Sequence, residues 1–395
     1  MDQSRYRPEV DGLRAVAVLG VLFFHAGFQS FSGGFLGVDV FFVISGFLIT
    51  RLIRDEVATG WLGFAHFYLR RARRLFPAMF VTLLATLVGA SLLFAPPHFE
   101  RFGGELLHAA LSVSNFYFWH EAGYFDTAAQ FKPLLHTWSL SVEEQFYVLW
   151  PPLLVFLLRR GRVRTLLGLL FLAGLASLLL AEALTSGLFA FWLLPFRAFE
   201  FCIGALTVWL VRFRPANTAW LDPVLLGGIA LVVGSFVVFT RATSFPSTAS
   251  LVPCIGAALV IYSGTARRAA RLLNNRAAVG IGLISYSIYL VHWPMIVFWG
   301  YWKLEPASES ERYALCALSV GVGWVMYRFV EMPFRRPDGP TRNLSPAGFG
   351  LACALLTPRR RILVMFSRVL RVYAAGAVLS ARYSGFGGRL PGRGA

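Results

Sequence analysis

Long apolar stretches set the strongest limit on how this chain can fold. Hydrophobic residues make up 57% of its 395 residues and charged residues only 14%, a composition outside the range of soluble domains. A helix of about 17–25 apolar residues is long enough to cross a bilayer. Ten stretches meet this length: approximately 10–28, 35–53, 75–95, 138–158, 163–183, 188–211, 221–240, 248–264, 279–299 and 312–331. We therefore predict an all-α polytopic integral membrane protein with about ten transmembrane helices.

The positive charges alternate between loops and predict which side of the membrane each loop faces. Arginine clusters precede the first and third stretches and follow the fourth, sixth, eighth and tenth, and the loops between them are nearly uncharged or acidic. Because basic loops stay in the cytoplasm, both termini are predicted to be cytoplasmic. The net charge of +17 is therefore a topology signal with some attraction to anionic lipid. We predict a lipid bilayer as partner and no nucleic acid.

Two ionisable residues, Arg14 and His25, share the first apolar stretch. They are eleven residues apart, about three helical turns, so they lie on nearly the same face and roughly 16 Å apart along the axis. An ionisable side chain inside a spanning helix usually marks a pathway or a reaction centre, so the pair is a functional hypothesis. The alternative is that Arg14 reaches the headgroups and that His25 is a hydrogen-bonded packing residue.

The loop charges assign a depth to each polar residue within the membrane, and two clusters result. The outer cluster comprises His25, Asp39, His136, Glu143, Glu144 and His292, and the inner cluster comprises Arg14, the arginines of 70–74 and Glu331. A carboxylate beside a histidine fixes the imidazole tautomer and stabilises the imidazolium, which makes His25 the candidate general base. The RRARR run offers forked donors that match phosphate oxygens, and its alternative role is that of a topology determinant.

Other polar residues are interpreted as structural. Arg197 and Glu200 are three residues apart on a helix and are expected to pair in the interior. Serines near the spans, such as Ser45 and Ser139, lie outside any GxSxG motif and rank below the histidine as nucleophiles. The four cysteines stand singly in apolar runs, so no metal site is predicted. Between spans two and three, the basic and aromatic segment 54–74 predicts an amphipathic helix on the inner surface.

Seven segments in series between about residues 6 and 336 carry a family resemblance. They read YRPEVDGLRAVAVLGVLFFH, GGFLGVDVFFVISGFLIT, FYLRRARRLFPA, HTWSLSVEEQFY, FRAFEFCIGAL, ISYSIYLVHWP and EMPFRR. Each segment alone is a weak signal, but the series in this order is highly specific. On these residues the chain resembles the membrane acyltransferase-3 family, whose members O-acylate bacterial surface glycans such as lipopolysaccharide O-antigen, peptidoglycan and exopolysaccharides.

The resemblance implies a multi-pass acyltransferase of the bacterial inner membrane. It would move an acetyl or other acyl group, other than an aminoacyl group, from cytoplasmic acetyl-CoA or another acyl-CoA to a sugar hydroxyl of a cell-surface or envelope glycan. Arg14 and His25 match the family's essential pair, and Arg71 and Arg74 match its cytoplasmic RxxR motif. The implied catalytic residues are His25, Arg14, Glu143 and Glu144, the last two within the SLxVEEQFY segment; the implied donor-binding residues are Arg71, Arg74 and Arg14; and the candidates on the acceptor side are Asp39, His136 and His292.

Two parts are predicted along the chain, an acyltransferase-3 transmembrane domain over 1–336 and a tail over 337–395. Larger family members continue through an eleventh span into an extracytoplasmic SGNH-hydrolase-like domain. Here the apolar run 344–356 is too short to cross a bilayer and passes into an arginine- and glycine-rich end that is predicted to be disordered. The chain is expected to be either a stand-alone type that transfers directly to the acceptor or a truncated version of the fused type.

Two other functions are compatible with the same polar residues. A transporter or flippase would use them to line a solute or proton path. An inactive, truncated homologue would retain them without any chemistry. Consumption of acyl-CoA separates an acyltransferase from both alternatives.

Overall fold

The structure is a computed structural model that describes residues 6–60, 63–122, 131–184 and 189–335. Within these ranges every regular element is a helix and no strand occurs, so the predicted all-α class is confirmed for this part of the chain. The tail predicted for 337–395, with its incomplete eleventh span, lies outside the described residues.

The helices follow the hydropathy pattern of the sequence. The predicted apolar stretches overlap α1 (Pro8–His25), α2 (Gly37–Ala58), α3 (Phe64–Leu93), α6 (Thr137–Arg159), α7 (Val163–Ala183), α8 (Leu194–Leu210), α9 (Leu221–Val238), α10 (Leu251–Ser263), α13 (Ser285–Lys303) and α14 (Glu309–Met326). The other helices are α4 (Pro96–Ala110), α5 (Ser114–Glu121), α11 (Arg271–Asn274), α12 (Arg276–Leu283), the π-helical turn Tyr327–Glu331 and α15 (Met332–Arg335). Short 3-10 turns lie at Gln29–Phe31, Gly34–Leu36, Val211–Phe213, Thr218–Trp220 and Thr248–Ser250.

Six helical segments of the described chain are long and apolar enough to cross a membrane. They are Gly34–Ala58, Phe64–Leu93, Val163–Ala183, Leu194–Phe213, Thr218–Val238 and Glu309–Arg335. The pair α12 and α13, bent by 65°, adds a seventh if it counts as one span. α1 and α6 carry more polar residues, and α10 is shorter. A multi-pass membrane protein is therefore supported, whereas ten spans and two cytoplasmic termini stay predictions.

The basic segment that follows α2 differs from the prediction. α2 continues to Ala58, and α3 begins at Phe64 and runs for 30 residues. The RRARR run therefore occupies the first turns of α3, and the prediction of a separate surface helix is wrong. Leu, Ala and Arg all favour helix, so the basic run propagates directly into the apolar part of the same helix.

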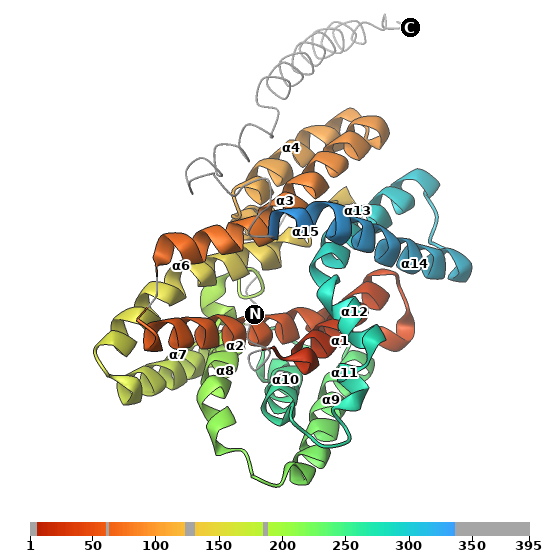
Figure 1. Cartoon of the computed structure of the whole chain (residues 1–395). Coiled ribbons are helices and arrows are strands. Elements are labelled where there is room, and N and C mark those ends of the chain that lie inside the picture. Colours follow the sequence, from red (N-terminus) through yellow and green to blue (C-terminus); the bar gives the residue numbers. More distant parts are fainter. Residues whose placement is uncertain (1–5, 61–62, 123–130, 185–188, 336–395) are drawn as a thin grey trace, which may run out of the picture. The chain divides into compact units, whose positions relative to one another are not determined.

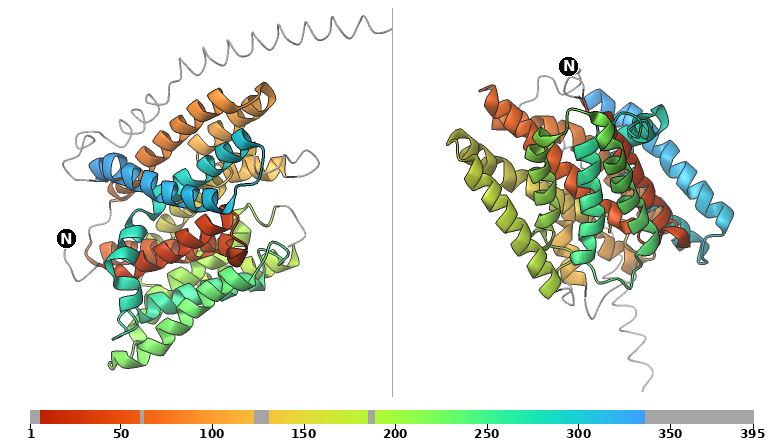
Figure 2. Two further views of the ribbon diagram at one scale, coloured as in Figure 1. Left: turned by 90° about the vertical axis from the view of Figure 1, so that its right-hand side faces the viewer. Right: turned by 90° about the horizontal axis from the view of Figure 1, so that it is seen from below.

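α1 lies among the other helices and contacts α2, α10, α12 and α13 (Figures 1 and 2). Its buried residues run from Glu9 to Leu22 and come from all sides of the helix. A helix that is buried all round belongs to the interior of an assembly. The surroundings of Arg14 and His25 are therefore set mostly by neighbouring helices.

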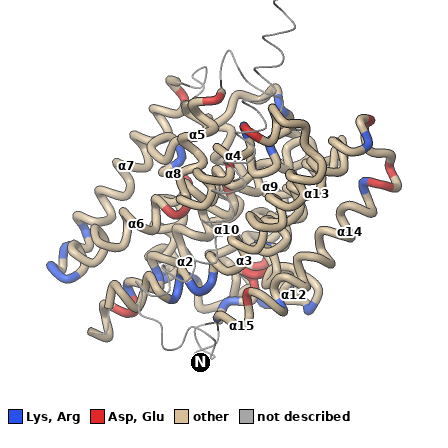
Figure 3. Tube along the Cα trace, turned by 90° about the horizontal axis from the view of Figure 1, so that it is seen from above, with Lys and Arg blue, Asp and Glu red and all other residues tan. Residues whose placement is uncertain are grey.

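Many charged residues lie near the ends of the helices, and a smaller number lie within the assembly (Figure 3). Basic residues gather around the turn between α6 and α7 and around α12 and α15, on the side where the first described residues lie. This distribution is the one expected of helices that cross a hydrocarbon layer, because a charge at the bilayer centre is costly.

α2 and α8 approach each other at a pair of glycines. A Cβ atom on Gly46 would lie 2.2 Å from the carbonyl oxygen of Phe201, and one on Gly204 would lie 2.0 Å from the carbonyl oxygen of Val43. Small residues at such positions let two membrane helices pack backbone to backbone. The contact fixes the position of α2 against α8.

We predict that Gly204→Ala destabilises the protein by about 1–3 kcal/mol, because the added methyl group cannot fit without moving α2 away from α8. The melting temperature of the detergent-purified protein measures the effect. Gly168→Ala is the matched control, since Gly168 lies in α7 with open space around its Cβ position. Equal melting temperatures for Gly204→Ala and Gly168→Ala would contradict the packing argument.

Candidate active site

Three histidines from three different helices meet in the structure. The Nδ1 atom of His25 lies 2.9 Å from the Nε2 atom of His292, and the ring centroids of His136 and His292 are 5.7 Å apart. His25 ends α1, His136 immediately precedes α6, and His292 lies within α13. The structure therefore brings together the three histidines that the sequence places at similar depth.

The hydrogen bonds of this cluster determine which nitrogen of His25 carries a proton. His292 Nδ1 lies 2.7 Å from the carbonyl oxygen of Tyr289, which only accepts, so His292 Nδ1 donates. In a neutral imidazole the other nitrogen then accepts, and His292 Nε2 receives the proton of His25 Nδ1. Within the described residues no hydrogen bond engages the Nε2 atom of His25, which therefore keeps its lone pair. The His25 side chain is partly exposed.

His136 is held in the other neutral tautomer, with its proton on Nε2 rather than on Nδ1. Its Nε2 atom lies 3.1 Å from the carbonyl oxygen of Leu290, which makes Nε2 the donor. Its Nδ1 atom is buried and has no hydrogen-bond partner within the described residues. Since an unpaired buried acceptor is costly, this atom is placed to receive a proton from a ligand or from water.

A cavity of about 70 Å³ lies beside the histidine cluster. Its polar lining residues are Arg14, Ser45, Arg71, Arg74, Ser139, Glu143, Tyr147, Ser285, Tyr286 and Tyr289. Tyr289 connects it to the histidines, because its hydroxyl bonds Ser139 Oγ at 2.6 Å and donates to the carbonyl oxygen of His136 at 3.0 Å. The carbonyl oxygen of Tyr289 is also the group that holds His292. Tyr289 thus contacts the histidines and also lines the cavity that contains the arginines.

Glu143 lies on the wall of this cavity rather than beside a histidine. Its carboxylate accepts hydrogen bonds from the hydroxyl groups of Ser45 and Tyr147. The guanidinium of Arg71 stacks over the Tyr147 ring, 4.5 Å from its centroid. Glu144 is partly buried and is not among the residues that line the cavity. The structure therefore associates Glu143 with the arginines.

Arg14 and Arg74 contribute positive charge to the same cavity. Arg14 forms a 3.3 Å ion pair with Asp11, which also accepts a 2.8 Å hydrogen bond from the hydroxyl of Tyr6. The Nε atom of Arg74 is buried and has no hydrogen-bond partner in the described part of the chain. A buried guanidinium with an unused donor favours an anionic ligand at this place.

Asp39 departs from its expected neighbourhood. Its carboxylate lies 3.4 Å from Arg197, which also forms a 3.0 Å ion pair with Glu200, and all three side chains are fully buried. The expected pairing of Arg197 with Glu200 is confirmed, and Asp39 joins it instead of the histidines. The ring of Phe245 covers the guanidinium at 4.7 Å. This cluster ties α2 to α8 and supports a structural role for Asp39.

The tyrosines of the site were not identified from the sequence, and the serines were ranked below the histidine without being assigned a place in the site. Tyr289 and Tyr147 supply hydroxyl groups to the cavity, and Ser45 and Ser139 bond them. One signal was present in the sequence, because Tyr289 stands three residues before His292 and its carbonyl oxygen is therefore one helical turn away. Among the described residues no group of three His, Cys, Asp or Glu side chains is arranged to hold a metal ion.

Comparison with known families agrees with the resemblance seen in the sequence. Residues 7–328 match the family model described as an acyltransferase domain. The chain belongs to this family. The match covers the helices that carry the histidine cluster and the arginine-lined cavity, from α1 to α14.

The chain is also similar to curated bacterial proteins. It is 31% identical over 353 residues to O-acetyltransferase OatA of Staphylococcus aureus, which covers 85% of this chain and 58% of that protein. It is 31% identical over 389 residues to the putative O-acetyltransferase SAS0844 of Staphylococcus aureus, which covers 92% of this chain and 64% of that protein. The chain thus spans less than two thirds of the length of these relatives. No solved structure matches it.

We predict that Asp39→Asn lowers the melting temperature of the purified protein. The substitution removes one partner of a fully buried ion cluster, a change that typically costs about 3–5 kcal/mol. Asp55→Asn is the matched control on the same helix, because the side chain of Asp55 is 24% exposed. An Asp39→Asn protein that melts with the wild type would show that Asp39 is not needed for the α2–α8 contact.

Proposed function

We propose that this protein is an O-acyltransferase of a bacterial inner, or plasma, membrane. It transfers an acetyl or other acyl group from cytoplasmic acyl-CoA to a sugar hydroxyl of a cell-surface or envelope glycan. The observation that carries the proposal is the free Nε2 lone pair of His25, linked through His292 and Tyr289 to a cavity lined by arginines. Family membership and the similarity to O-acetyltransferases support the same reaction class.

In this proposal His25 is the general base. Its Nε2 atom accepts the proton of the acceptor hydroxyl while the hydroxyl oxygen bonds to the acyl carbonyl carbon. The carbon–sulfur bond of the thioester then breaks, and the thiolate takes up the proton from His25. The hydrogen bond from His25 Nδ1 to His292 keeps the reactive nitrogen unprotonated beforehand and stabilises the imidazolium during transfer.

The arginines bind the anionic part of the donor in this proposal. Arg71, Arg74 and Arg14 present guanidinium groups on one cavity, and guanidinium forks match phosphate oxygens. Arg14 and His25 lie about 16 Å apart along α1, so a donor held by its phosphates reaches the base only if its acyl group sits on a long arm. Acyl-CoA has this construction. Glu143 and Tyr147 orient Arg71.

The acceptor reaches His25 from the outer side of the membrane in this proposal, as the loop charges predict. His136 and His292 stand beside His25, and the unpartnered Nδ1 atom of His136 is a candidate acceptor for a sugar hydroxyl proton. The acceptor glycan in this proposal is a lipopolysaccharide O-antigen or a related surface polysaccharide.

We predict that His25→Ala lowers the transfer rate by about 10²–10⁴-fold, because it removes the general base. The measurement is the transfer of labelled acetyl from acetyl-CoA to envelope glycan by purified protein in membranes. His66→Ala is the matched control, since His66 is exposed at the start of α3. Equal rates for the wild type and His25→Ala would remove His25 from catalysis.

We predict that Arg71→Gln and Arg74→Gln each raise the KM for acetyl-CoA by about tenfold with a smaller change in kcat, because a charge-assisted phosphate contact is lost. Arg70→Gln is the control from the same run, because its side chain is 40% exposed and bonds Glu56 instead of lining the cavity. The kinetics contradict donor binding if all three variants share one KM. If membranes that contain the protein translocate glycan without consuming acetyl-CoA, the protein would instead be identified as a flippase.

A further inference from the structure

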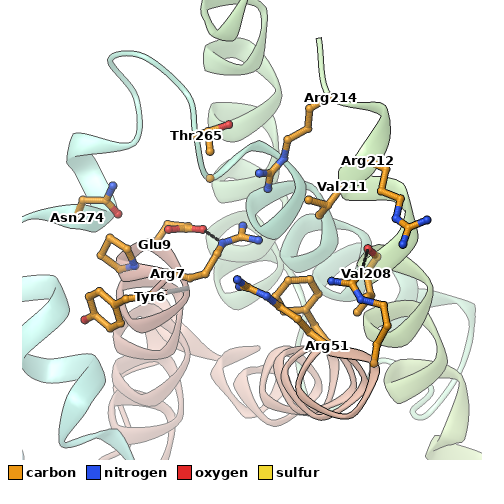
Figure 4. Close-up of a pocket in the computed structure, with 14 residues that line it drawn as sticks. Tyr6, Arg7, Glu9, Arg51, Val208, Val211, Arg212, Arg214, Thr265 and Asn274 are labelled. Atoms are coloured by element: carbon orange, nitrogen blue, oxygen red, sulfur yellow. Dashed lines mark hydrogen bonds and ion pairs between the residues drawn. The ribbon is translucent and has the colours of Figure 1, made fainter. Parts of the chain in front are cut away.

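Another, larger cavity of about 600 Å³ is lined by arginines from separate segments of the chain. Arg7 precedes α1, Arg51 and Arg54 belong to α2, and Arg212 and Arg214 follow α8. Figure 4 shows Arg7, Arg51 and Arg214 directed into one space between the ends of these helices, with Arg212 at its edge. Its volume lies in the range of ligand pockets, which is about 300–1,000 Å³.

The two cavities lie along different parts of α2. Phe41 and Ser45 line the cavity next to the histidines, whereas Phe47, Arg51 and Arg54 line the larger one. At a rise of about 1.5 Å per residue, Arg51 lies about 9 Å further along the helix than Ser45. No residue lines both cavities. The arginine-rich cavity is therefore separate from the site to which acyl transfer is assigned.

Two carboxylates partly neutralise this cavity. Glu9 pairs with Arg7, and Asp55 lies 2.8 Å from Arg54 and 3.8 Å from Arg51. Among the described residues, five guanidinium groups thus face two carboxylates, which leaves an excess of positive charge. Such an excess in a partly enclosed space is unfavourable unless an anion enters.

Arg212 and Arg214 contribute two of these positive charges. Within the described residues neither lies at ion-pair distance from a carboxylate, and Arg214 donates to the carbonyl oxygens of Ile261, at 2.9 Å, and Tyr262. Burial, with the positive charge of Arg7 next in size, lowers the pKa of Arg214 to about 10. The side chain is thus held at the cavity wall beside another cation.

These arginines do more than mark the inner side of the membrane. A topology determinant needs only a charge near the headgroups, and it is satisfied by an exposed side chain. Here the side chains of Arg7, Arg51 and Arg54 are only 13%, 20% and 23% exposed. Gly264 on the opposite wall has no room for a Cβ atom, which would lie 2.3 Å from a carboxylate oxygen of Glu9. The backbone at Gly264 therefore packs directly against the carboxylate of Glu9, which pairs with Arg7.

We propose that this arginine cavity binds a phosphate ester, either the headgroup of an anionic phospholipid or the phosphate of a soluble metabolite. Guanidinium forks from three segments surround a phosphate group with matching donors. Phe47, Val208 and Val211 provide apolar wall for the part of the ligand attached to the phosphate. The site is additional to acyl transfer, and no step of that reaction uses it.

The test measures binding to the full chain purified in detergent. One arm uses labelled inorganic pyrophosphate, and the other uses short-chain phosphatidylglycerol, with the matching phosphatidylcholine as the neutral lipid. Arg212→Glu is the main variant, because this side chain is exposed at the cavity edge and its reversal spares the fold. Arg164→Glu, exposed in α7 away from the cavity, is the matched control.

The expected result is that Arg212→Glu weakens binding of one or both anionic probes at least tenfold while Arg164→Glu does not. Loss confined to phosphatidylglycerol identifies a lipid headgroup as the ligand, and loss confined to pyrophosphate identifies a soluble phosphate. Arg214→Gln is a second variant, for which weaker binding of the anionic probes is also expected. Its melting temperature without ligand shows whether the variant is folded. Absence of binding to both probes, or equal weakening by Arg212→Glu and Arg164→Glu, overturns the proposal.

Discussion

The hydrogen bond between His25 and His292 joins α1 to α13 inside a layer where polar groups are costly. Each imidazole must find a partner there, and the backbone carbonyl of Tyr289 ends the chain of donors. One consequence is structural, because the end of α1 is held against α13. The other is chemical, because the same chain leaves an unprotonated nitrogen on His25. The packing of α1 and the reactivity proposed for His25 thus depend on the same hydrogen bond.

The positions of the helices could be predicted from hydropathy because burial in hydrocarbon acts on whole segments. Their ends could not. The run Arg70–Arg74 was assigned to a surface helix, yet it belongs to α3, which continues past it through Pro77. α1 and α6 fall short of the usual hydropathy of a span since they carry the polar residues of the site. Functional residues weaken the very signal that locates their helices.

The sequence predicts how deep in the membrane each residue of the candidate site lies, but not which way its side chain points around the helix. Hydropathy and loop charges place a residue along the membrane normal, whereas its angle around the helix axis depends on packing. His25, His136 and His292 were predicted at one depth and are also directed toward one another. Asp39 was predicted at the same depth, but Gly46 and Gly204 set α2 against α8 so that this carboxylate faces Arg197. No spacing rule within one segment contains that information.

The two arginine-lined cavities illustrate what α2 does in the molecule. Its faces meet three different environments, through Ser45, Asp39 and Arg51, and a rotation by one residue would displace all three. The glycine contact with α8 and the buried ion cluster oppose such a rotation. Coupling between two sites requires an element with two arrangements, and a pinned helix has only one. α2 therefore separates the two arginine-lined cavities rather than transmitting between them.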